Sequence, residues 1–151
     1  LWPYALNEAA MLKEDTASMI ACDTYVDGHP LANYLGDGLI ISTPTGSTAY
    51  NLSAGGPIIQ PSAPVWAISP IAPHALTMRP LVVSDRSVIS VTAGSRSGSF
   101  RLSLDGNSIT VASGVTVRIS KAPFNILVAS DSRNNWSDNL RRKLMWGIDP
   151  R

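Results

Sequence analysis

The sequence predicts an all-β protein, a β-sandwich of short antiparallel strands with one short internal helix and one C-terminal helix. Three observations support this class. Apolar and polar residues alternate over short segments, Asp-Gly pairs separate several of these segments, and only two stretches break the pattern. Alternation gives a strand one buried and one wet face, and Asp-Gly between two such segments is a strong hairpin signal. Short strands with frequent turns are typical of a sandwich or barrel.

The expected strands follow one another along most of the chain. The first hairpin joins residues 17–26, through Asp27-Gly28, to a strand that resumes near Leu31. A second hairpin turns at Asp105-Gly106, which we interpret as a turn only. The remaining segments that alternate or are rich in β-branched and apolar residues are 39–41, 87–92, 100–104, 108–111, 115–120 and 124–128.

Two stretches predict helices instead. Residues 48–54 lie between hydroxyl-bearing residues and the stop signal Gly55-Gly56-Pro57, with Ser47 or Thr48 as the expected N-cap. Near the end of the chain, Ser137 or Asp138 is expected to cap a helix with Leu140 and Leu144 on one face. Its basic run, 141–143, lies where cations favour the helix dipole.

Composition excludes several classes of protein. A chain of 151 residues supports one domain with a sizeable core. With 44% apolar and 15% charged residues it is not predicted to be disordered, and a net charge of +1 gives no sign of a nucleic-acid partner. The single Cys22 excludes an internal disulfide and fits a reducing compartment. No apolar run or signal peptide predicts membrane contact, so we expect a cytoplasmic protein. Its first residue is Leu1 rather than Met, which suggests part of a longer protein.

The stretch 36–57 carries the strongest chemical signal. A tight turn leads into a short apolar strand, which Pro44 and Gly46 end, and a hydroxyl-rich helix start follows. Helix starts expose unpaired N–H groups that bind phosphates and other polar groups, and Thr45, Ser47 and Thr48 add hydroxyls that can donate or accept. Tyr50 offers an aromatic face to a flat heterocycle. A ligand-binding turn and an ordinary strand-to-helix connection, whose hydroxyls only cap the helix, both remain open.

Longer motifs resemble the C-terminal domain of NAD kinases. The signature is Asp37-Gly38, then Ser-Thr-Pro-Thr-Gly-Ser-Thr-Ala-Tyr over 42–50, then Gly-Gly-Pro-Ile over 55–58. Further matching pieces, in the family's order, are Asn7-Glu8, Ile-Ser-Pro-Ile-Ala-Pro-His-Ala-Leu over 68–76, Arg-Pro-Leu-Val-Val over 79–83, Leu-Asp-Gly over 104–106 and Arg-Arg-Lys-Leu over 141–144. The resemblance spans nearly the whole chain and implies the same β-sandwich.

The resemblance implies an activity and a pocket. The family phosphorylates the 2′-hydroxyl of the adenosine ribose of NAD, using ATP, to give NADP. By position, Asn7 and Glu8 would hydrogen-bond ribose or nicotinamide-side groups, and Tyr50 would stack on a ring. Asp37 would reach a dinucleotide held mainly by a neighbouring subunit, which implies a homo-oligomer, a dimer or tetramer. The implied NAD-binding residues are Asn7, Glu8, Asp37, Thr45, Thr48, Ala49, Tyr50, Ser53, Ala72 and His74. His74 could equally be a structural histidine satisfied by the backbone.

The family's catalytic motif is not in this sequence. A Gly-Gly-Asp-Gly segment in an N-terminal α/β domain is expected to supply the base, whereas here Leu35 precedes Gly36-Asp37-Gly38. We therefore expect residues 1–151 to be the NAD-binding and oligomerisation domain, without a catalytic residue or metal ligand and inactive alone. ATP and a divalent metal, Mg²⁺, are expected for the full enzyme, with the tail 136–151 packed on the missing domain.

Other functional classes remain as alternatives. The chain could be a β-sandwich that binds dinucleotide or drives self-association without turnover. A related lipid kinase is disfavoured, because its second domain is not expected to carry the Thr-Gly-Ser-Thr-Ala-Tyr string and the Ala-Pro-His segment together. Nucleophilic catalysis by Cys22 is weaker still, because no histidine lies near it in the sequence and a buried structural thiol is the better interpretation.

Overall fold

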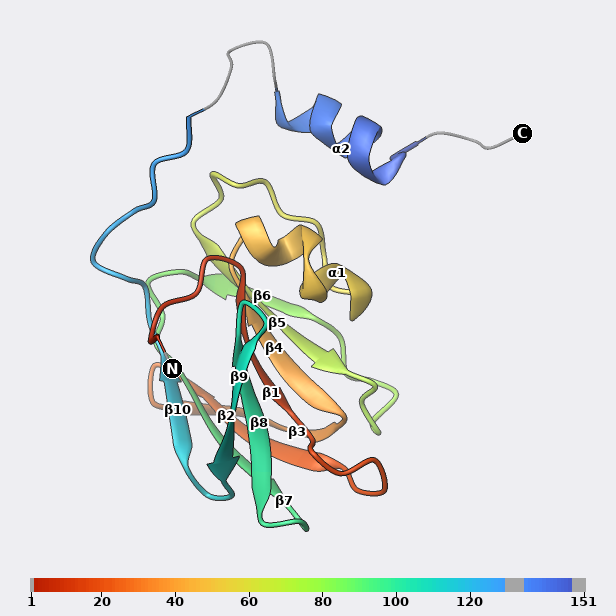
Figure 1. Ribbon diagram of the computed structural model, residues 1–151, viewed down its shortest axis with the longest axis vertical. Helices are drawn as coiled ribbons and strands as arrows, with labels where there is room; N and C mark the ends of the chain where they lie inside the picture. Colours follow the sequence, from red (N-terminus) through yellow and green to blue (C-terminus); the bar gives the residue numbers. More distant parts are fainter. Residues whose placement is uncertain (1, 130–134, 148–151) are drawn as a thin grey trace.

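The computed structural model describes residues 2–129 and 135–147. Two antiparallel sheets face each other, which confirms the predicted β-sandwich (Figure 1). The larger sheet has the order β6 (Leu81–Ser84), β5 (Val65–Ile71), β4 (Gly38–Ser42), β1 (Glu8–Leu12), β8 (Ser99–Leu104), β9 (Asn107–Ala112). The smaller sheet has the order β10 (Thr116–Ile119), β7 (Ile89–Ser95), β2 (Ile20–Val26), β3 (His29–Gly36). The helical turns η1 (Thr45–Thr48) and α1 (Tyr50–Ser53) lie over one end of the larger sheet (Figure 1).

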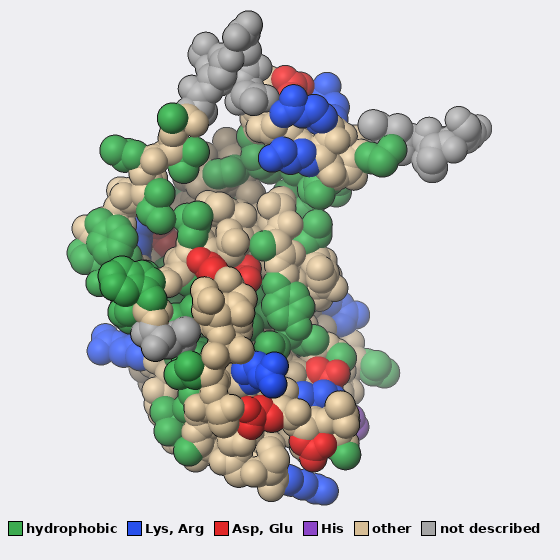
Figure 2. All heavy atoms as spheres, viewed as in Figure 1, with side chains coloured by type: hydrophobic (Ala, Val, Ile, Leu, Met, Phe, Trp, Pro, Cys, Tyr) green, Lys and Arg blue, Asp and Glu red, His purple; other side chains and the backbone are tan. Residues whose placement is uncertain are grey.

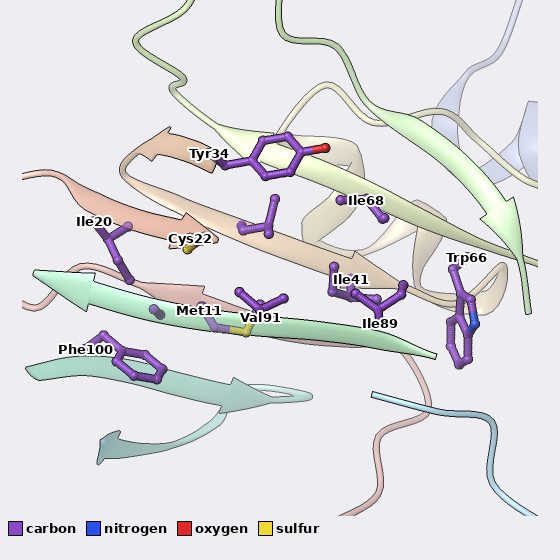
Figure 3. Close-up of a cluster of buried hydrophobic side chains, with 12 residues drawn as sticks. Met11, Ile20, Cys22, Tyr34, Ile41, Trp66, Ile68, Ile89, Val91 and Phe100 are labelled. Carbon is purple, nitrogen blue, oxygen red and sulfur yellow. The ribbon is translucent and has the colours of Figure 1, made fainter. Parts of the chain in front are cut away.

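The hydrophobic core fills the space between the two sheets (Figure 3). Strand β2 sends Ile20 and Cys22 inward, and β7 sends Ile89 and Val91 inward, each at the two-residue spacing that alternation predicts. Phe100 of β8 is fully buried against them from the larger sheet. Burying an apolar side chain of this size stabilises the fold by about 1.5–3 kcal/mol, so the core fixes how the sheets pack.

Both Asp-Gly hairpins are confirmed. The turn between β2 and β3 has positive φ angles at Asp27 (51°) and Gly28 (79°), and the turn between β8 and β9 has the same pattern at Asp105 (47°) and Gly106 (84°). Two consecutive residues with positive φ are the requirement of a tight two-residue hairpin turn, and Asp-Gly meets it at low steric cost. The two hairpins therefore share one local conformation on different sheets.

The sequence prediction of a strand at 124–128 is wrong. These residues make no strand ladder and are all exposed. The ring of Phe124 instead meets Tyr4 at a centroid distance of 4.9 Å, and Tyr4 meets Trp2 at 5.4 Å. The apolar run therefore begins in a surface aromatic cluster rather than continuing a sheet.

Three strands of the larger sheet, β1, β5 and β6, were not among the expected strands. Residues Glu8–Met11 of β1 are all buried, and so are Trp66–Pro70 of β5. Strands covered on both faces show no alternation of apolar and polar residues, so the pattern that finds half-buried strands passes over β1 and β5. Pro70 also argues against a central strand in a sequence-based prediction. Strand β6 is different, since it has only four residues and is mostly exposed.

The helices are confirmed, but their predicted caps are wrong. The internal helix is split into η1 and α1, whose N-caps are Pro44 and Ala49, and neither has a side-chain cap. The C-terminal helix α2 (Trp136–Leu144) is capped by Asn135, whose Oδ1 accepts the Asp138 N–H at 2.8 Å. Helix α2 buries no residue, and Lys and Arg side chains gather on it (Figure 2).

Candidate functional site

The predicted residues Asn7-Glu8 and Thr45–Tyr50 meet at one end of the larger sheet. Strands β1 and β4 pair antiparallel with Glu8 opposite Ser42, which brings the start of β1 beside the end of β4. The Thr43 N–H donates to the Asn7 carbonyl at 2.9 Å. Gly46 packs directly on Asn7, since a Cβ at Gly46 would lie 2.1 Å from the Asn7 carbonyl oxygen. Only glycine permits this approach, which explains the Thr-Gly-Ser step of the motif.

Glu8 presents the most unusual group of this region. It is only 8% exposed, and its Oε2 has no hydrogen-bond partner among the described residues. Burial raises the pKa of Glu8, the negative charge of Asp105 raises it further, and the Tyr50 N–H opposes the rise. A buried carboxylate oxygen without a partner in the protein is costly, and the hydroxyl of a ligand would satisfy it.

The remaining predicted residues of this group lie on or between η1 and α1 and are mostly exposed. Thr45, Thr48, Tyr50 and Ser53 are exposed, and Ala49 is half-buried. Tyr50 is 40% exposed at the start of α1, and its backbone N–H opposes the rise in the pKa of Glu8. The site therefore combines a buried acceptor with exposed hydroxyls and an aromatic ring, which suits a ligand with both sugar and heterocycle.

A buried amide holds α1 in place, and sequence reasoning missed it. The Asn51 Nδ2 donates to the carbonyls of Ser47 (3.1 Å) and Pro57 (3.0 Å), and its Oδ1 accepts the Ser69 hydroxyl at 2.6 Å. A Cβ at Gly56 would lie 2.1 Å from the Asn51 Oδ1. The only sequence signal was a polar residue in a short helix followed by two glycines.

The hydroxyl of Ser47 has a similar supporting role rather than the predicted capping or ligand role. It is buried, donates to the Pro44 carbonyl at 2.6 Å and accepts the Ile59 N–H at 3.0 Å. It thereby ties η1 to the segment that follows Gly55-Gly56-Pro57.

The other predicted residues, Asp37, Ala72 and His74, form a separate group at the opposite end of β4. The Asp37 N–H donates to the Ile71 carbonyl at 2.9 Å, and the His74 N–H donates to the Leu35 carbonyl at 2.8 Å. Lys13 Nζ lies 2.7 Å from the Asp37 Oδ1. The five-residue step along β4 from Asp37 to Ser42, which lies opposite Glu8, separates this group from the first by about 17 Å at roughly 3.4 Å per residue. The structure thus divides the ten predicted residues into two groups.

Asp105 was predicted to be a turn residue only, and the structure gives it more contacts. Its Oδ2 accepts the Leu6 N–H at 2.6 Å, and its Oδ1 accepts the N–H groups of Asn7 (2.8 Å) and Glu8 (3.0 Å). The β8–β9 hairpin therefore holds the segment that carries Asn7 and Glu8. No local sequence signal could show a contact across 98 residues.

Other chemistry finds little support in the described part of the chain. Residues 2–129 and 135–147 contain no group of three or more His, Cys, Asp or Glu that could hold a metal ion. Burial raises the pKa of Cys22 to about 12, so its thiol is not a ready nucleophile. No helix in the ranges that the structure describes is long and apolar enough to cross a membrane.

Comparison with known proteins agrees with this geometry. The model of the ATP-NAD kinase C-terminal domain matches residues 6–130. The NAD kinase of Bacteroides fragilis is 48% identical over 149 residues, which cover 99% of this chain and 51% of that protein. The NAD kinase of Porphyromonas gingivalis is 46% identical over 144 residues, covering 95% of this chain and 50% of that protein. The chain thus spans about half the length of these relatives.

Two solved structures resemble the fold. One is the yeast NADH kinase complexed with NADH, with a TM-score of 0.88 and 27% identity, covering 97% of this chain and 46% of that one. The other is the NAD kinase from Archaeoglobus fulgidus in complex with ATP, with a TM-score of 0.72 and 36% identity, covering 80% and 46%. The sequence motifs, the sandwich and the matched family model lead to one conclusion: this chain belongs to the family of ATP-NAD kinase C-terminal domains.

Proposed function

We propose that this chain is the dinucleotide-binding part of an NAD kinase, which phosphorylates the 2′-hydroxyl of the adenosine ribose of NAD to give NADP. The observation that carries the proposal is the buried Glu8 Oε2, which lacks a partner among the described residues beside the exposed ring of Tyr50. Relatives of about twice this length are named NAD kinase. The solved relatives that carry NADH and ATP support the two substrate classes.

In this proposal the chain binds and orients NAD rather than performing the chemical step. Glu8 accepts a hydrogen bond from a ribose hydroxyl, Asn7 contacts the same part of the dinucleotide, and the Tyr50 ring stacks on a base. Thr45 and Thr48 offer exposed hydroxyls to polar groups at the same rim. Phosphoryl transfer depends mainly on positioning and charge stabilisation, so a binding domain contributes directly to the rate.

We assign the catalytic base and the binding of ATP and its metal ion to the part of the longer relatives that this chain does not match. ATP is the proposed donor and Mg²⁺ its accompanying ion, both held by an N-terminal α/β domain that carries a Gly-Gly-Asp-Gly motif. A cytoplasmic location is proposed with it, because a reducing compartment suits an unpaired cysteine such as Cys22.

Asp37, Ala72 and His74 are proposed to complete the pocket of a neighbouring subunit in a dimer or tetramer. Their support is the separation along β4, which places them about 17 Å from the first group. Lys13 pairs with Asp37 within the chain and would hold this carboxylate in place for an incoming dinucleotide.

Calorimetric titration of NAD into the folded chain tests the proposal. The Asn7→Ala, Tyr50→Ala double variant should lose binding, because it removes the stacking ring and one polar contact. Tyr25→Ala is a matched control, since Tyr25 is 39% exposed, nearly as much as Tyr50, but lies on the smaller sheet. If the folded chain failed to bind NAD, or if all three proteins bound it equally, the assignment of the pocket to these residues would be wrong.

A further inference from the structure

The carboxylate of Asp105 gathers three consecutive backbone N–H groups from a segment about a hundred residues away. These donors belong to Leu6, Asn7 and Glu8, at distances of 2.6, 2.8 and 3.0 Å. The Asp105 N–H returns a bond to the Glu8 carbonyl at 3.2 Å. Hydrogen bonds to an ionised acceptor are among the stronger ones in proteins. The start of β1 is thus fixed on its β8 side by one side chain.

The same segment is fixed on its β4 side by backbone contacts. The Thr43 N–H donates to the Asn7 carbonyl at 2.9 Å, the Thr43 hydroxyl donates to the Leu6 carbonyl at 2.6 Å, and Gly46 packs against Asn7. The N–H groups of Leu6, Asn7 and Glu8 therefore point to Asp105, and the carbonyl groups of Leu6 and Asn7 face the Thr43–Gly46 turn. Without Asp105, three N–H groups would lose their partner and only one side would remain anchored.

We propose that Asp105 is a positioning residue of the dinucleotide site, which holds the Asn7-Glu8 backbone so that the two side chains meet the same ribose. The proposal rests on the proposed NAD-binding function. Asp105 does not touch the ligand in it and acts only through the segment that it holds. Asp105 lies in the hairpin between β8 and β9, and its carboxylate makes a tertiary contact in addition to forming the turn.

The chain contains an internal comparison for this idea. Asp27 occupies the same position in the other Asp-Gly hairpin, with φ of 51° against 47° at Asp105. Its Oδ1 also accepts a distant backbone N–H, that of Val88, at 2.8 Å. Asp27, however, holds the start of β7 in the smaller sheet and no predicted site residue. A carboxylate that only tightens a hairpin should behave alike at both positions.

Two substitutions at Asp105 separate the effect of its hydrogen bonds to the Leu6–Glu8 segment from the effect of its charge. Asp105→Gly removes all three acceptor bonds without strain at the positive φ, because glycine adopts that region freely. Asp105→Asn removes the charge but keeps an oxygen that can accept from Asn7 and Glu8, since both donate to Oδ1. Asn also tolerates the left-handed conformation better than most residues. Asp27→Gly is the matched control for the loss of a hairpin carboxylate.

Hydrogen exchange measured by NMR on the chain tests the hold without any ligand. Asp105→Gly should speed exchange of the Leu6, Asn7 and Glu8 amides by about tenfold or more, because exchange reports local opening. Asp105→Asn should affect mainly Leu6, and Asp27→Gly none of the three. The titration of Glu8 should change as well. Asp105→Asn should lower the pKa of Glu8, since the negative charge of Asp105 raises it. Unchanged exchange in Asp105→Gly would overturn the proposal.

NAD titration then tests the consequence for binding. We expect Asp105→Gly to weaken binding by about tenfold to a hundredfold, the scale on which a misplaced group lowers function, and Asp105→Asn to weaken it less. Asp27→Gly should leave the affinity for NAD unchanged, even if it lowers the melting temperature as much as Asp105→Gly does. Equal losses of affinity in Asp27→Gly and Asp105→Gly would overturn the positioning role. A further outcome is that the unaltered chain binds no NAD while hydrogen exchange changes as expected in the variants. In that case the function proposed above is wrong, but the conclusion that Asp105 holds the Leu6–Glu8 segment is still supported.

Discussion

Replacing Asn51 by alanine tests how the dinucleotide site is supported. The change removes three buried hydrogen bonds, two from Nδ2 to the carbonyls of Ser47 and Pro57 and one from the Ser69 hydroxyl to Oδ1. A typical hydrogen bond contributes about 1 kcal/mol net, and a buried group left without a partner costs about 1–3 kcal/mol. The free energy of unfolding should therefore fall by about 3 kcal/mol or somewhat more, a large share of the roughly 5–15 kcal/mol of an ordinary domain.

Differential scanning calorimetry and urea unfolding measure this effect. For a chain of this size, about 3 kcal/mol corresponds to a melting temperature lower by roughly 6–12 °C. Ser69→Ala, which removes one of the three bonds, should lose less than Asn51→Ala. The double variant should fall short of the sum, because the two residues share a bond. Asn125→Ala, at an exposed asparagine, should stay within about 0.5 kcal/mol of the unaltered chain.

A loss below about 1 kcal/mol for Asn51→Ala would contradict this prediction, since a single hydrogen bond contributes about that much and the substitution removes three. Additive losses in the Asn51 and Ser69 variants would show that the network is not coupled as the distances indicate. NAD binding provides a second readout, because α1 carries Tyr50 and is joined to β5 through the hydrogen bond between Asn51 and Ser69. The affinity should fall in Asn51→Ala at temperatures where the variant is still folded.

Three further predictions concern the site and the core. Gly46→Ala should weaken NAD binding by at least about tenfold, because the new Cβ would lie 2.1 Å from the Asn7 carbonyl oxygen. Gly94→Ala is the control, since its Cβ would meet nothing within 4 Å, and it should leave the affinity for NAD measured by calorimetry unchanged. Burial raises the pKa of Glu8 above its ordinary 4.5, so its contribution to stability is present below that value and is lost as pH rises through the folded pKa. Glu8→Gln should therefore raise the melting temperature at about pH 7 and not at about pH 4, and an equal change at both would contradict this linkage. Cys22, with a pKa raised to about 12, should react with a thiol reagent only after unfolding in guanidinium, and rapid labelling of the native chain would contradict its burial.

Sequence patterns predicted the half-buried strands well but missed two of the interior strands of the larger sheet, β1 and β5. The smaller sheet has one face in the core and alternates clearly, as in β2 and β10, and both Asp-Gly hairpins were found from the conformation that their turns require. Strands β1 and β5 lie in the middle of the larger sheet, and their long buried runs leave no period-two signal. The run 124–128 shows the opposite error, because apolar residues at the surface imitate a strand.

The candidate site shows the same division. The string from Thr45 to Tyr50 and the Asn7-Glu8 pair were both identifiable from the sequence, because each resembles a family motif as a contiguous string. That they form one site follows from the pairing of β1 with β4, and that Asp37 lies apart from them follows from the length of β4. Antiparallel register decides such distances, and register is a property of the sheet rather than of any one strand.

Short contiguous patterns were enough to predict the fold class, the two Asp-Gly hairpins and the motif residues of the proposed dinucleotide site. The folded arrangement was needed to show that Asp105 holds the Asn7-Glu8 segment, that Asn51 holds α1 in place, and that Glu8 is buried with an oxygen that lacks a partner among the described residues. The physical reason is that hydrogen-bond satisfaction and burial depend on groups brought together from distant parts of the chain. The strand order β4-β1-β8 brings those groups together, and no local pattern encodes it.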